Sequence, residues 1–340
     1  MPRVLICGPY PDPIGGISIH IQRLATLLNR AAIGTSFCDE SANKKENIFN
    51  IRSLNFIAYA SLIFKSDIVH IHSSIGIFRL MHLLFAFVMR KKTIVTLHSW
   101  RNGVISSYIW SLLFNLLCSK IILVNHEISK RLKVNIAKQV LYPAFIPPLD
   151  VLGDLPIELS AFIASAKLQH KKIASSNAFR IVEHNRQDLY GLDLCIDAFS
   201  KKEISESAVL VFSISDPSTN LKKIECYLKI IAERKLQDVI YLQLGSINFY
   251  ALLQSSDISI RATNTDGDAL SIRESLFLNK PCIASDCTNR PEGTQLFKNR
   301  SLDSLSESIL NALRAPLPAR SNSGALQEIE NFYLKLYTDF

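Results

Sequence analysis

The stretch around residues 257–292 constrains the fold of this 340-residue chain more than any other part of its sequence. It begins with a short apolar run over 257–261, which has the length and character of a buried strand. A polar loop follows over 262–268, then a helix-like segment over 270–278, and residues 281–285 form a second apolar run. Strand, loop, helix and strand make up the βαβ unit of a parallel sheet. Ligands bind such sheets beyond the carboxyl ends of the strands, so this loop is the first candidate for a site.

Backbone amides are exposed where the loop passes into the helix. Ala269, Leu270 and Ser271 lie at the expected helix start, where N–H groups have no helical partner and the helix dipole is positive. Gly267 and Asp268 precede them directly. A site of this kind suits an anion such as a diphosphate.

Charged side chains surround these amides. Asp266 and Glu274 stand eight residues apart, one on the loop and one on the helix, and carboxylates accept hydrogen bonds from sugar and ribose hydroxyl groups. Arg261 and Arg273 are candidates for countercharge.

A structural explanation of the same residues stays open. Ser271 and Glu274 form the S-x-x-E pattern of a capping box, which needs no ligand. The run Asp266-Gly267-Asp268 is also typical of a turn.

The first half of the chain repeats the α/β pattern. Residues 3–8 predict a buried strand, and a loop leads from there to Gly15 and Gly16 at the start of a helix over 17–29. Glycines at such a turn allow close approach of a bound group, although a tight turn alone explains them as well. No G-x-G-x-x-G pattern is present, so no dinucleotide site is expected. Residues 35–55 are polar and predict a surface connection.

Three histidines accompany two further predicted strands. His70 and His72 lie on one face of the strand over 67–72, and His98 follows the strand over 92–97. Without an evident third ligand nearby, we interpret His70 and His72 as hydrogen-bonded sheet residues and expect no metal site. His98 stands at a strand's carboxyl end, where a neutral imidazole can bind a hydroxyl group.

Length and composition describe a protein of two domains with large cores, 48% of it hydrophobic. No apolar stretch reaches the ~18 residues of a membrane span, and the first residues do not resemble a signal peptide. Seven cysteines without a C-x-x-C pair indicate a reducing, cytoplasmic setting. A run of prolines over 143–156 predicts the interdomain linker.

Charge is distributed unevenly along the chain. Residues 1–150 carry 17 Lys/Arg and 7 Asp/Glu, a net charge of +10, while residues 151–340 carry a net charge of −2. A basic half indicates an anionic partner, or simply a solubilising surface. Because no basic stretch is interleaved with aromatic residues, we expect a membrane surface and no nucleic acid.

The segment from Asp266 onward resembles retaining glycosyltransferases of family 4, of the bacterial surface-polysaccharide type. Their E-x7-E motif appears as Asp266 and Glu274, and the runs 280–286 (KPCIASD) and 290–293 (RPEG) fit the same pattern. The resemblance implies a GT-B fold, in which two Rossmann-like, doubly wound domains of parallel α/β sheet face a cleft. The domains would be 1–150 and 151–324, with a last helix over 325–340 that returns to the first.

The resemblance also implies roles for residues. His98, Asp266 and Glu274 would act on the transferred sugar and the ribose, and the residues that bind the donor would be Gly15, Gly16, Arg180, Arg186, Arg261, Gly267, Asp268, Ala269, Leu270, Ser271 and Glu274. Tyr190-Gly191 stands where the family has Lys-Gly, which leaves open whether Arg180, Arg186 or Arg261 supplies the missing charge.

The expected function is transfer of a sugar from a nucleotide-sugar to a lipid-linked saccharide in surface-polysaccharide or O-antigen synthesis, with no cofactor or metal. The protein would be cytoplasmic and peripheral at the inner face of the membrane, held by its basic first half. A nucleotide-sugar 2-epimerase on the same fold is the alternative.

Overall fold

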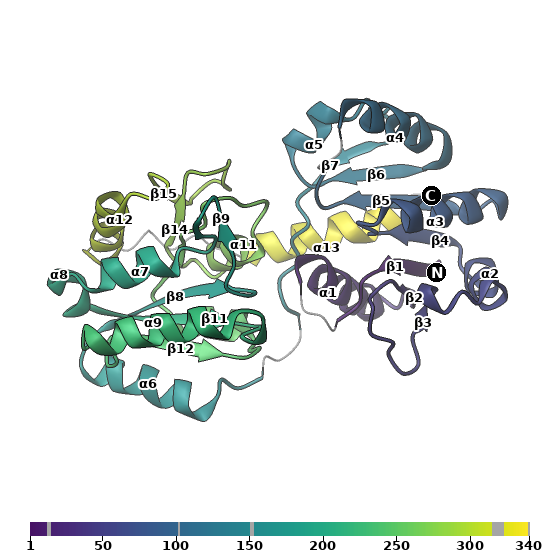
Figure 1. The fold of residues 1–340 in the computed structure, drawn as a ribbon. Coiled ribbons are helices and arrows are strands. Elements are labelled where there is room, and N and C mark those ends of the chain that lie inside the picture. The colour runs from purple at the N-terminus through teal and green to yellow at the C-terminus, as the bar shows by residue number, and fades with distance from the viewer. Residues whose placement is uncertain (12–14, 101–102, 150–152, 315–322, 339–340) are drawn as a thin grey trace. The chain divides into compact units, whose positions relative to one another are not determined.

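The computed structural model describes residues 1–11, 15–100, 103–149, 153–314 and 323–338. The chain divides into two compact units, Met1–Asp150 with Ser323–Phe340, and Val151–Asn322. Each unit contains one parallel sheet with helices packed on it (Figure 1). Part of the predicted linker lies outside the described residues.

The first unit is built on a seven-stranded parallel sheet of order β3-β2-β1-β4-β5-β6-β7. Its strands are β1 (Arg3–Gly8), β2 (Gly34–Asp39), β3 (Phe49–Asn50), β4 (Ile68–Ile71), β5 (Lys92–Leu97), β6 (Lys120–Leu123) and β7 (Gln139–Leu141). Its helices are α1 (Gly16–Arg30), the 3-10 helix η1 (Ile51–Ser53), α2 (Phe56–Lys65), α3 (Gly76–Val88), α4 (Val104–Leu117), α5 (His126–Arg131) and α13 (Ser323–Thr338). The direction of strand addition reverses between β1 and β4, which makes their carboxyl ends a switch point.

The segment 35–55 is not the surface connection that its polar sequence predicts. Residues 34–39 form β2, which pairs with β1 along its whole length, and β3 follows at the sheet edge. Asp39 and Asn50 are buried there because they bond each other, with Asn50 Nδ2 donating to Asp39 Oδ2 at 3.1 Å. Buried polar side chains that hydrogen-bond to each other can take the place of apolar residues in a strand. Such a strand lacks the run of apolar residues by which strands are predicted from sequence.

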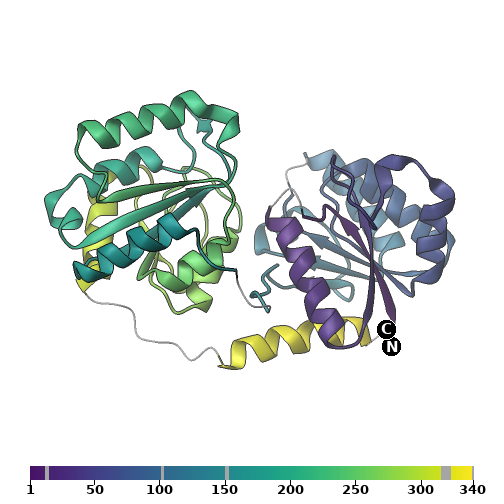
Figure 2. The same ribbon diagram turned by 90° about the horizontal axis from the view of Figure 1, so that it is seen from below.

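The last helix, α13, belongs to the first unit. Tyr337 on α13 is hydrogen-bonded through its hydroxyl to His70 Nδ1 on β4, and Phe332 stacks on Tyr142. The view from below shows α13 beside α1, in agreement with the ring contact between His20 and Tyr333 (Figure 2).

The second unit is built on a six-stranded parallel sheet of order β12-β11-β8-β13-β14-β15 and carries an antiparallel β9–β10 hairpin. Its strands are β8 (Lys172–Ala178), β9 (Glu183–His184), β10 (Gln187–Asp188), β11 (Ala208–Ile214), β12 (Ile240–Leu244), β13 (Ile258–Arg261), β14 (Cys282–Ser285) and β15 (Gln295–Phe297). Its helices are α6 (Ile157–Leu168), α7 (Leu192–Phe199), α8 (Lys202–Ser205), η2 (Ser218–Asn220), α9 (Leu221–Glu233), α10 (Phe249–Ser255), α11 (Leu270–Phe277) and α12 (Leu302–Arg314). The predicted strand, loop, helix and strand at 257–285 are β13, α11 and β14.

Burial explains why the central strands read as continuous apolar runs. Every residue of β11 is buried, as are all of β4 and β14, because helices cover both faces of a parallel sheet. Within the described residues, no helix is long and apolar enough to cross a bilayer.

The backbone conformation and the packing at position 191 require glycine. Its φ of +73° lies in the left-handed region, and a Cβ added there would stand 2.3 Å from the carbonyl oxygen of Ala262. We therefore expect Gly191→Ala to lower the free energy of unfolding by about 2–5 kcal/mol. Gly16→Ala is the matched control, because no atom lies within 4 Å of its Cβ position and its effect should stay within about 1 kcal/mol. Chemical denaturation measures both, and equal effects of the two substitutions would contradict the assignment.

Candidate functional site

Three neighbouring strands of the second unit bring polar side chains to one edge of the sheet. β8, β13 and β14 lie side by side, and Asn177, Arg261 and Ser285 stand at or near their carboxyl ends. Arg261 Nη1 donates to the carbonyl oxygen of Asn177 at 3.2 Å. The strand order reverses between β8 and β13, so this edge is the switch point at which open α/β sheets bind ligands.

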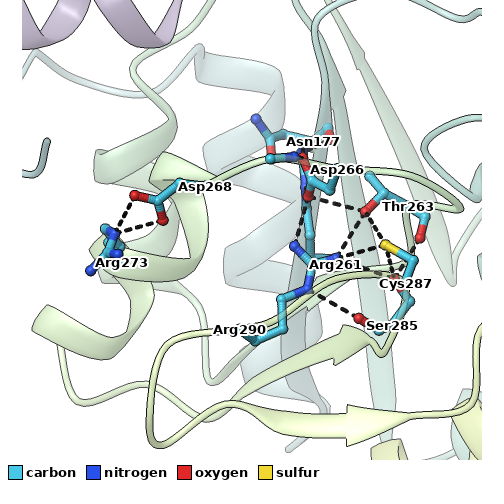
Figure 3. A network of polar contacts seen from close by, with 10 residues as sticks. Asn177, Arg261, Thr263, Asp266, Asp268, Arg273, Ser285, Cys287 and Arg290 are labelled. Carbon is cyan, nitrogen blue, oxygen red and sulfur yellow. Dashed lines mark hydrogen bonds and ion pairs between the residues drawn. The ribbon is translucent and has the colours of Figure 1, made fainter. Parts of the chain in front are cut away.

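The carboxylate of Asp266 is the centre of a polar network at this edge (Figure 3). Arg261 Nε and Nη2 donate to its Oδ2 and Oδ1 at 2.9 and 3.2 Å, and Arg290 Nη1 donates to Oδ2 at 2.9 Å. Thr263 Oγ1 donates to Oδ2 at 3.1 Å. Burial by itself would raise the pKa of Asp266, but Arg261 and Arg290 outweigh it and lower this pKa to about 2.

These contacts bear on the role predicted for Asp266. Both of its oxygens already accept hydrogen bonds, including one at 3.0 Å from the amide of Gly267. The geometry assigns the carboxylate first to holding two guanidinium groups in place. Its predicted contact with a sugar hydroxyl stays a prediction.

Arg290 is a residue of this network that the sequence argument did not select. Its side chain is only 2% exposed, and its Nε donates to the carbonyl oxygen of Ser285 at 3.0 Å. The sequence feature that could have pointed to Arg290 is the run RPEG, which follows β14. The ion pair with Asp266, which lies on another loop, could not be seen from spacing.

Arg261 places a positive charge beside Tyr190, the residue that stands where the resembled family has a lysine. The guanidinium carbon of Arg261 is 5.2 Å from the centroid of the Tyr190 ring, a cation–π contact. Arg180 lies just past β8 over the Phe179 ring, and Arg186 is exposed between β9 and β10. Of the three candidates, Arg261 is the one that contacts Tyr190.

The start of α11 presents the predicted amides. Ala269 is the N-cap residue and makes no side-chain cap hydrogen bond, so Leu270 and Ser271 are the first two helical residues. The capping-box interpretation is therefore wrong, because Ser271 is not at the cap and cannot pair with Glu274 in that motif. Within the part of the chain that is described, no group accepts from the amides of Ala269, Leu270 and Ser271.

The remaining charged residues of this segment are held close to the helix. Arg273 Nε donates to the two oxygens of Asp268 at 2.7 and 3.0 Å, so these two residues neutralise each other. Glu274 is buried, with 4% of its surface exposed.

A pocket of about 210 Å³ lies in the first unit beyond the carboxyl ends of β4 and β5. It is lined by polar and aromatic residues: Ile17, His72, Ser73, Ser74, Gly76, Arg79, His98, Ser99 and Trp100. His98 is therefore in a pocket, as its place after a strand predicted. Burial lowers its pKa to about 4, so the imidazole is neutral at physiological pH.

Gly15 and Gly16 begin α1 of the same unit. Gly15 is the N-cap residue, and its amide donates to Ser18 Oγ at 2.8 Å. A Cβ on Gly16 would meet no atom within 4 Å, so packing among the described residues does not require glycine there. Residues 12–14 of the preceding loop lie outside the described part of the chain.

The two histidines at the carboxyl end of β4 differ from each other: His70 lies on the strand and His72 directly follows it. His70 is hydrogen-bonded through both ring nitrogens, to Tyr337 and to Thr96 Oγ1, as expected of a sheet histidine. His72 Nδ1 is hydrogen-bonded to His98 Nε2 at 3.0 Å, but its Nε2 is buried with no partner among the described residues. The expectation that both histidines are satisfied is right for His70 and wrong for His72.

The low pKa of Asp266 predicts a pH-dependent contribution to stability. A carboxyl group whose folded pKa is depressed stabilises the protein above its unfolded pKa of about 4, and this contribution disappears as pH falls towards 2. Asp266→Asn should lower the free energy of unfolding at pH 7 by about 2 kcal/mol or more, because Arg261 and Arg290 then lack their countercharge. The difference from wild type should shrink between pH 4 and 2.

Denaturant unfolding at a series of pH values measures this difference. Asp268→Asn is the matched control, since it breaks one ion pair and leaves the network intact. A difference for Asp266→Asn that does not depend on pH would refute the assignment.

Comparison with known proteins gives a fold and no family. No protein-family profile matches the chain, and no curated protein matches its sequence. Among solved structures, Anabaena Alr3699/HepE in complex with UDP-glucose is 11% identical over the whole of both chains, with a TM-score of 0.67. A Rickettsia africae glycosyltransferase is 15% identical over 99% of both chains, with a TM-score of 0.67.

A third structure, the sucrose-phosphate synthase of Thermosynechococcus elongatus, is 13% identical over the whole of both chains, with a TM-score of 0.65. These likenesses together with the two parallel sheets confirm the predicted fold class: the chain has the GT-B fold of glycosyltransferases.

Proposed function

We propose that the protein is a retaining glycosyltransferase that moves a sugar from a nucleotide-sugar to a saccharide acceptor. The observation that carries this proposal is the start of α11, where three amides without a partner among the described residues follow the loop that holds Asp266 between Arg261 and Arg290. HepE, which shares the fold, was solved with UDP-glucose.

The charge at this edge suits a diphosphate. Two guanidinium groups share the one carboxylate of Asp266, which leaves one positive charge, and the positive end of the α11 dipole adds to it. In the transfer, the bond between the anomeric carbon and the diphosphate of the nucleotide-sugar breaks, and the nucleoside diphosphate leaves. Donors placed where this negative charge develops stabilise the transition state without a strong protein acid.

The proposal assigns a binding role to each of the other candidate residues. Amides of Ala269, Leu270 and Ser271 bind the diphosphate beside Gly267 and Asp268, and Glu274 binds the ribose. Arg261 takes the place of the family lysine. On the first unit, His98 binds a substrate hydroxyl group as a neutral imidazole, and the turn at Gly15 and Gly16 leaves room for a bound group.

The reaction needs no protein nucleophile in this scheme. The acceptor hydroxyl attacks the anomeric carbon on the face that the diphosphate leaves, and it passes its proton to the departing phosphate oxygen. Retention of configuration follows because both events take place on one face. The 2-epimerase alternative would need further free carboxylates at the donor, whereas Asp266 and Asp268 are already paired with arginines.

We further propose that the acceptor is lipid-linked, as in surface-polysaccharide or O-antigen synthesis, and that the first unit rests on the anionic inner face of the membrane. Helix α4 buries Ser107 and Ser111 together with Phe114 and Leu117, and it exposes several other apolar side chains. The exposed apolar residues of α2, α3 and α4 are Phe56, Ile57, Phe64, Ile77, Leu84, Phe87, Val88, Val104, Ile105, Tyr108, Ile109, Leu112 and Leu116. Basic residues flank these helices, among them Lys65 and the run Arg90-Lys91-Lys92.

Nucleotide-sugar binding tests the donor site. A nucleotide-sugar bound only by the folded protein should raise the melting temperature, and at a hundred times its Kd it adds about 2.7 kcal/mol of stability. Glu274→Gln should weaken binding roughly 10- to 100-fold by removing a charged acceptor from the ribose. Calorimetric titration with a panel that includes UDP-glucose measures both effects.

Glu233→Gln provides the matched control, because Glu233 is an exposed residue of α9 whose ion pair with Lys229 is at the surface. The donor site is wrong if no nucleotide-sugar stabilises the wild type, or if the two glutamine variants bind alike. Release of nucleoside diphosphate only when acceptor is added distinguishes transfer from epimerisation.

Vesicle binding tests the membrane surface. We expect the protein to co-sediment with anionic phosphatidylglycerol vesicles and to be released by high salt, since each nearby Lys or Arg contributes about 1 kcal/mol. Ile105→Glu should weaken binding roughly tenfold or more, because Ile105 is 79% exposed on the apolar face of α4. Leu228→Glu, on α9 of the second unit, should have no effect. Equal binding to neutral and anionic vesicles would exclude the electrostatic contribution.

A further inference from the structure

We propose that His20, His72 and His98 form a binding site for a divalent transition metal of the zinc type, with one coordination position open to the pocket of the first unit. The site goes beyond the proposed transfer reaction but shares His98 with it, so its test measures metal binding and not sugar transfer. It is also separate from the donor residues of the second unit, for which no metal is expected.

The three imidazoles come from three elements of the first unit. His20 lies on α1, His72 directly follows β4, and His98 directly follows β5. One nitrogen from each ring falls within 4.8 Å of the other two. His72 Nδ1 and His98 Nε2 are hydrogen-bonded to each other at 3.0 Å, a contact between two ligands that a shared metal ion would replace. Ligands at 2.0–2.1 Å in a tetrahedral zinc site stand about 3.3 Å apart. The widest pair would therefore close by at most about 1.5 Å, which side-chain rotation can supply.

The second observation is that buried nitrogens in this cluster lack partners. Among the described residues, both ring nitrogens of His20 and Nε2 of His72 make no hydrogen bond of normal geometry, and the two side chains are almost fully buried, at 2% and 1% exposed. The backbone of Ala144 is a polar neighbour of the His20 ring. Buried polar atoms are nearly always paired, so each exception needs an explanation. A metal ion explains one such nitrogen in a ring, because an imidazole coordinates through a single nitrogen lone pair.

Three protein ligands are the number found in catalytic zinc sites. Zinc sites with three histidines keep a fourth position for water or substrate, whereas structural sites are closed by four protein ligands. His72 and His98 line the pocket of about 210 Å³, which provides the space for this fourth ligand. Arg79 is buried at the same pocket and adds positive charge, so the favoured fourth ligand is an anionic oxygen.

Neighbouring groups are excluded as ligands by their contacts. His70 stacks on His72 at 4.1 Å between ring centroids, but both of its nitrogens are hydrogen-bonded. A second cluster in the same unit, Cys7, Cys38 and His82, has the proximity of a metal site. There both nitrogens of His82 already contact Tyr59 and Glu40, so no ring nitrogen is left for an ion.

Metal titration of the full, untagged chain tests the proposal. After chelator treatment and dialysis, we expect the protein to bind one Zn²⁺ by calorimetry and by elemental analysis. His98→Ala should weaken this binding roughly 100-fold or more, since even the loss of an outer-shell partner costs 10- to 100-fold. His20→Phe should do the same, and without metal it should fold at least as stably as wild type, because it removes two unpaired nitrogens.

His184→Asn is the control for adventitious binding, because His184 is an exposed histidine on β9 of the second unit, and it should bind zinc like wild type. Co²⁺ then reports the ligands through its visible absorption. A tetrahedral spectrum without thiolate charge transfer is expected. A thiolate band would place the metal at Cys7 and Cys38 and overturn the proposal. Unchanged zinc affinity in folded His98→Ala and His20→Phe, or no zinc bound by wild type, would overturn it too. Since the readout is metal binding, a failure here is distinct from a failure of sugar transfer.

Discussion

The ion pairs that join Asp266 to Arg261 and Arg290 hold together the site edge of the second unit. The end of β13, the loop that follows it and the loop after β14 meet at this carboxylate. All three side chains are largely buried, and a buried charge is tolerated only when it is paired and hydrogen-bonded. The network therefore fixes the loop that leads into α11, and with it the direction of the amides at the start of that helix.

This network also explains how the chain departs from the family that its sequence resembles without losing positive charge. The resembled enzymes carry a lysine where this chain has Tyr190. We propose Arg261 at the end of β13 as the source of this charge, because its guanidinium lies over the Tyr190 ring and is aligned by Asp266. A planar guanidinium can use one edge for a carboxylate while its face contacts an aromatic ring, which an ammonium group cannot do.

The first unit combines two features that are unusual for an ordinary core. Helix α4 turns serines inward, where Ser107 Oγ accepts from Trp100 Nε1 at 2.8 Å, and it turns isoleucine and leucine outward. On α1 and at the end of β4 the same unit buries imidazole nitrogens of His20 and His72 that make no hydrogen bond of normal geometry with the described residues. Each arrangement lowers stability in isolation, so we attribute the first to a surface that meets lipid and the second to an ion.

Local periodicity by itself determined the α/β class, the main strands and helices, and the polar loop before α11. These properties depend on residues that are close in the chain, as the run at 257–285 illustrates. Only the tertiary structure decided that Ser271 lies inside its helix, that Arg290 reaches Asp266, and that His20 and His98 meet His72. The reason is that such contacts depend on the order of strands in the sheet and on which residue ends each strand, and spacing along the sequence encodes neither. The strand β2 escaped prediction for the same reason, because the partners that satisfy its buried polar groups come from other segments.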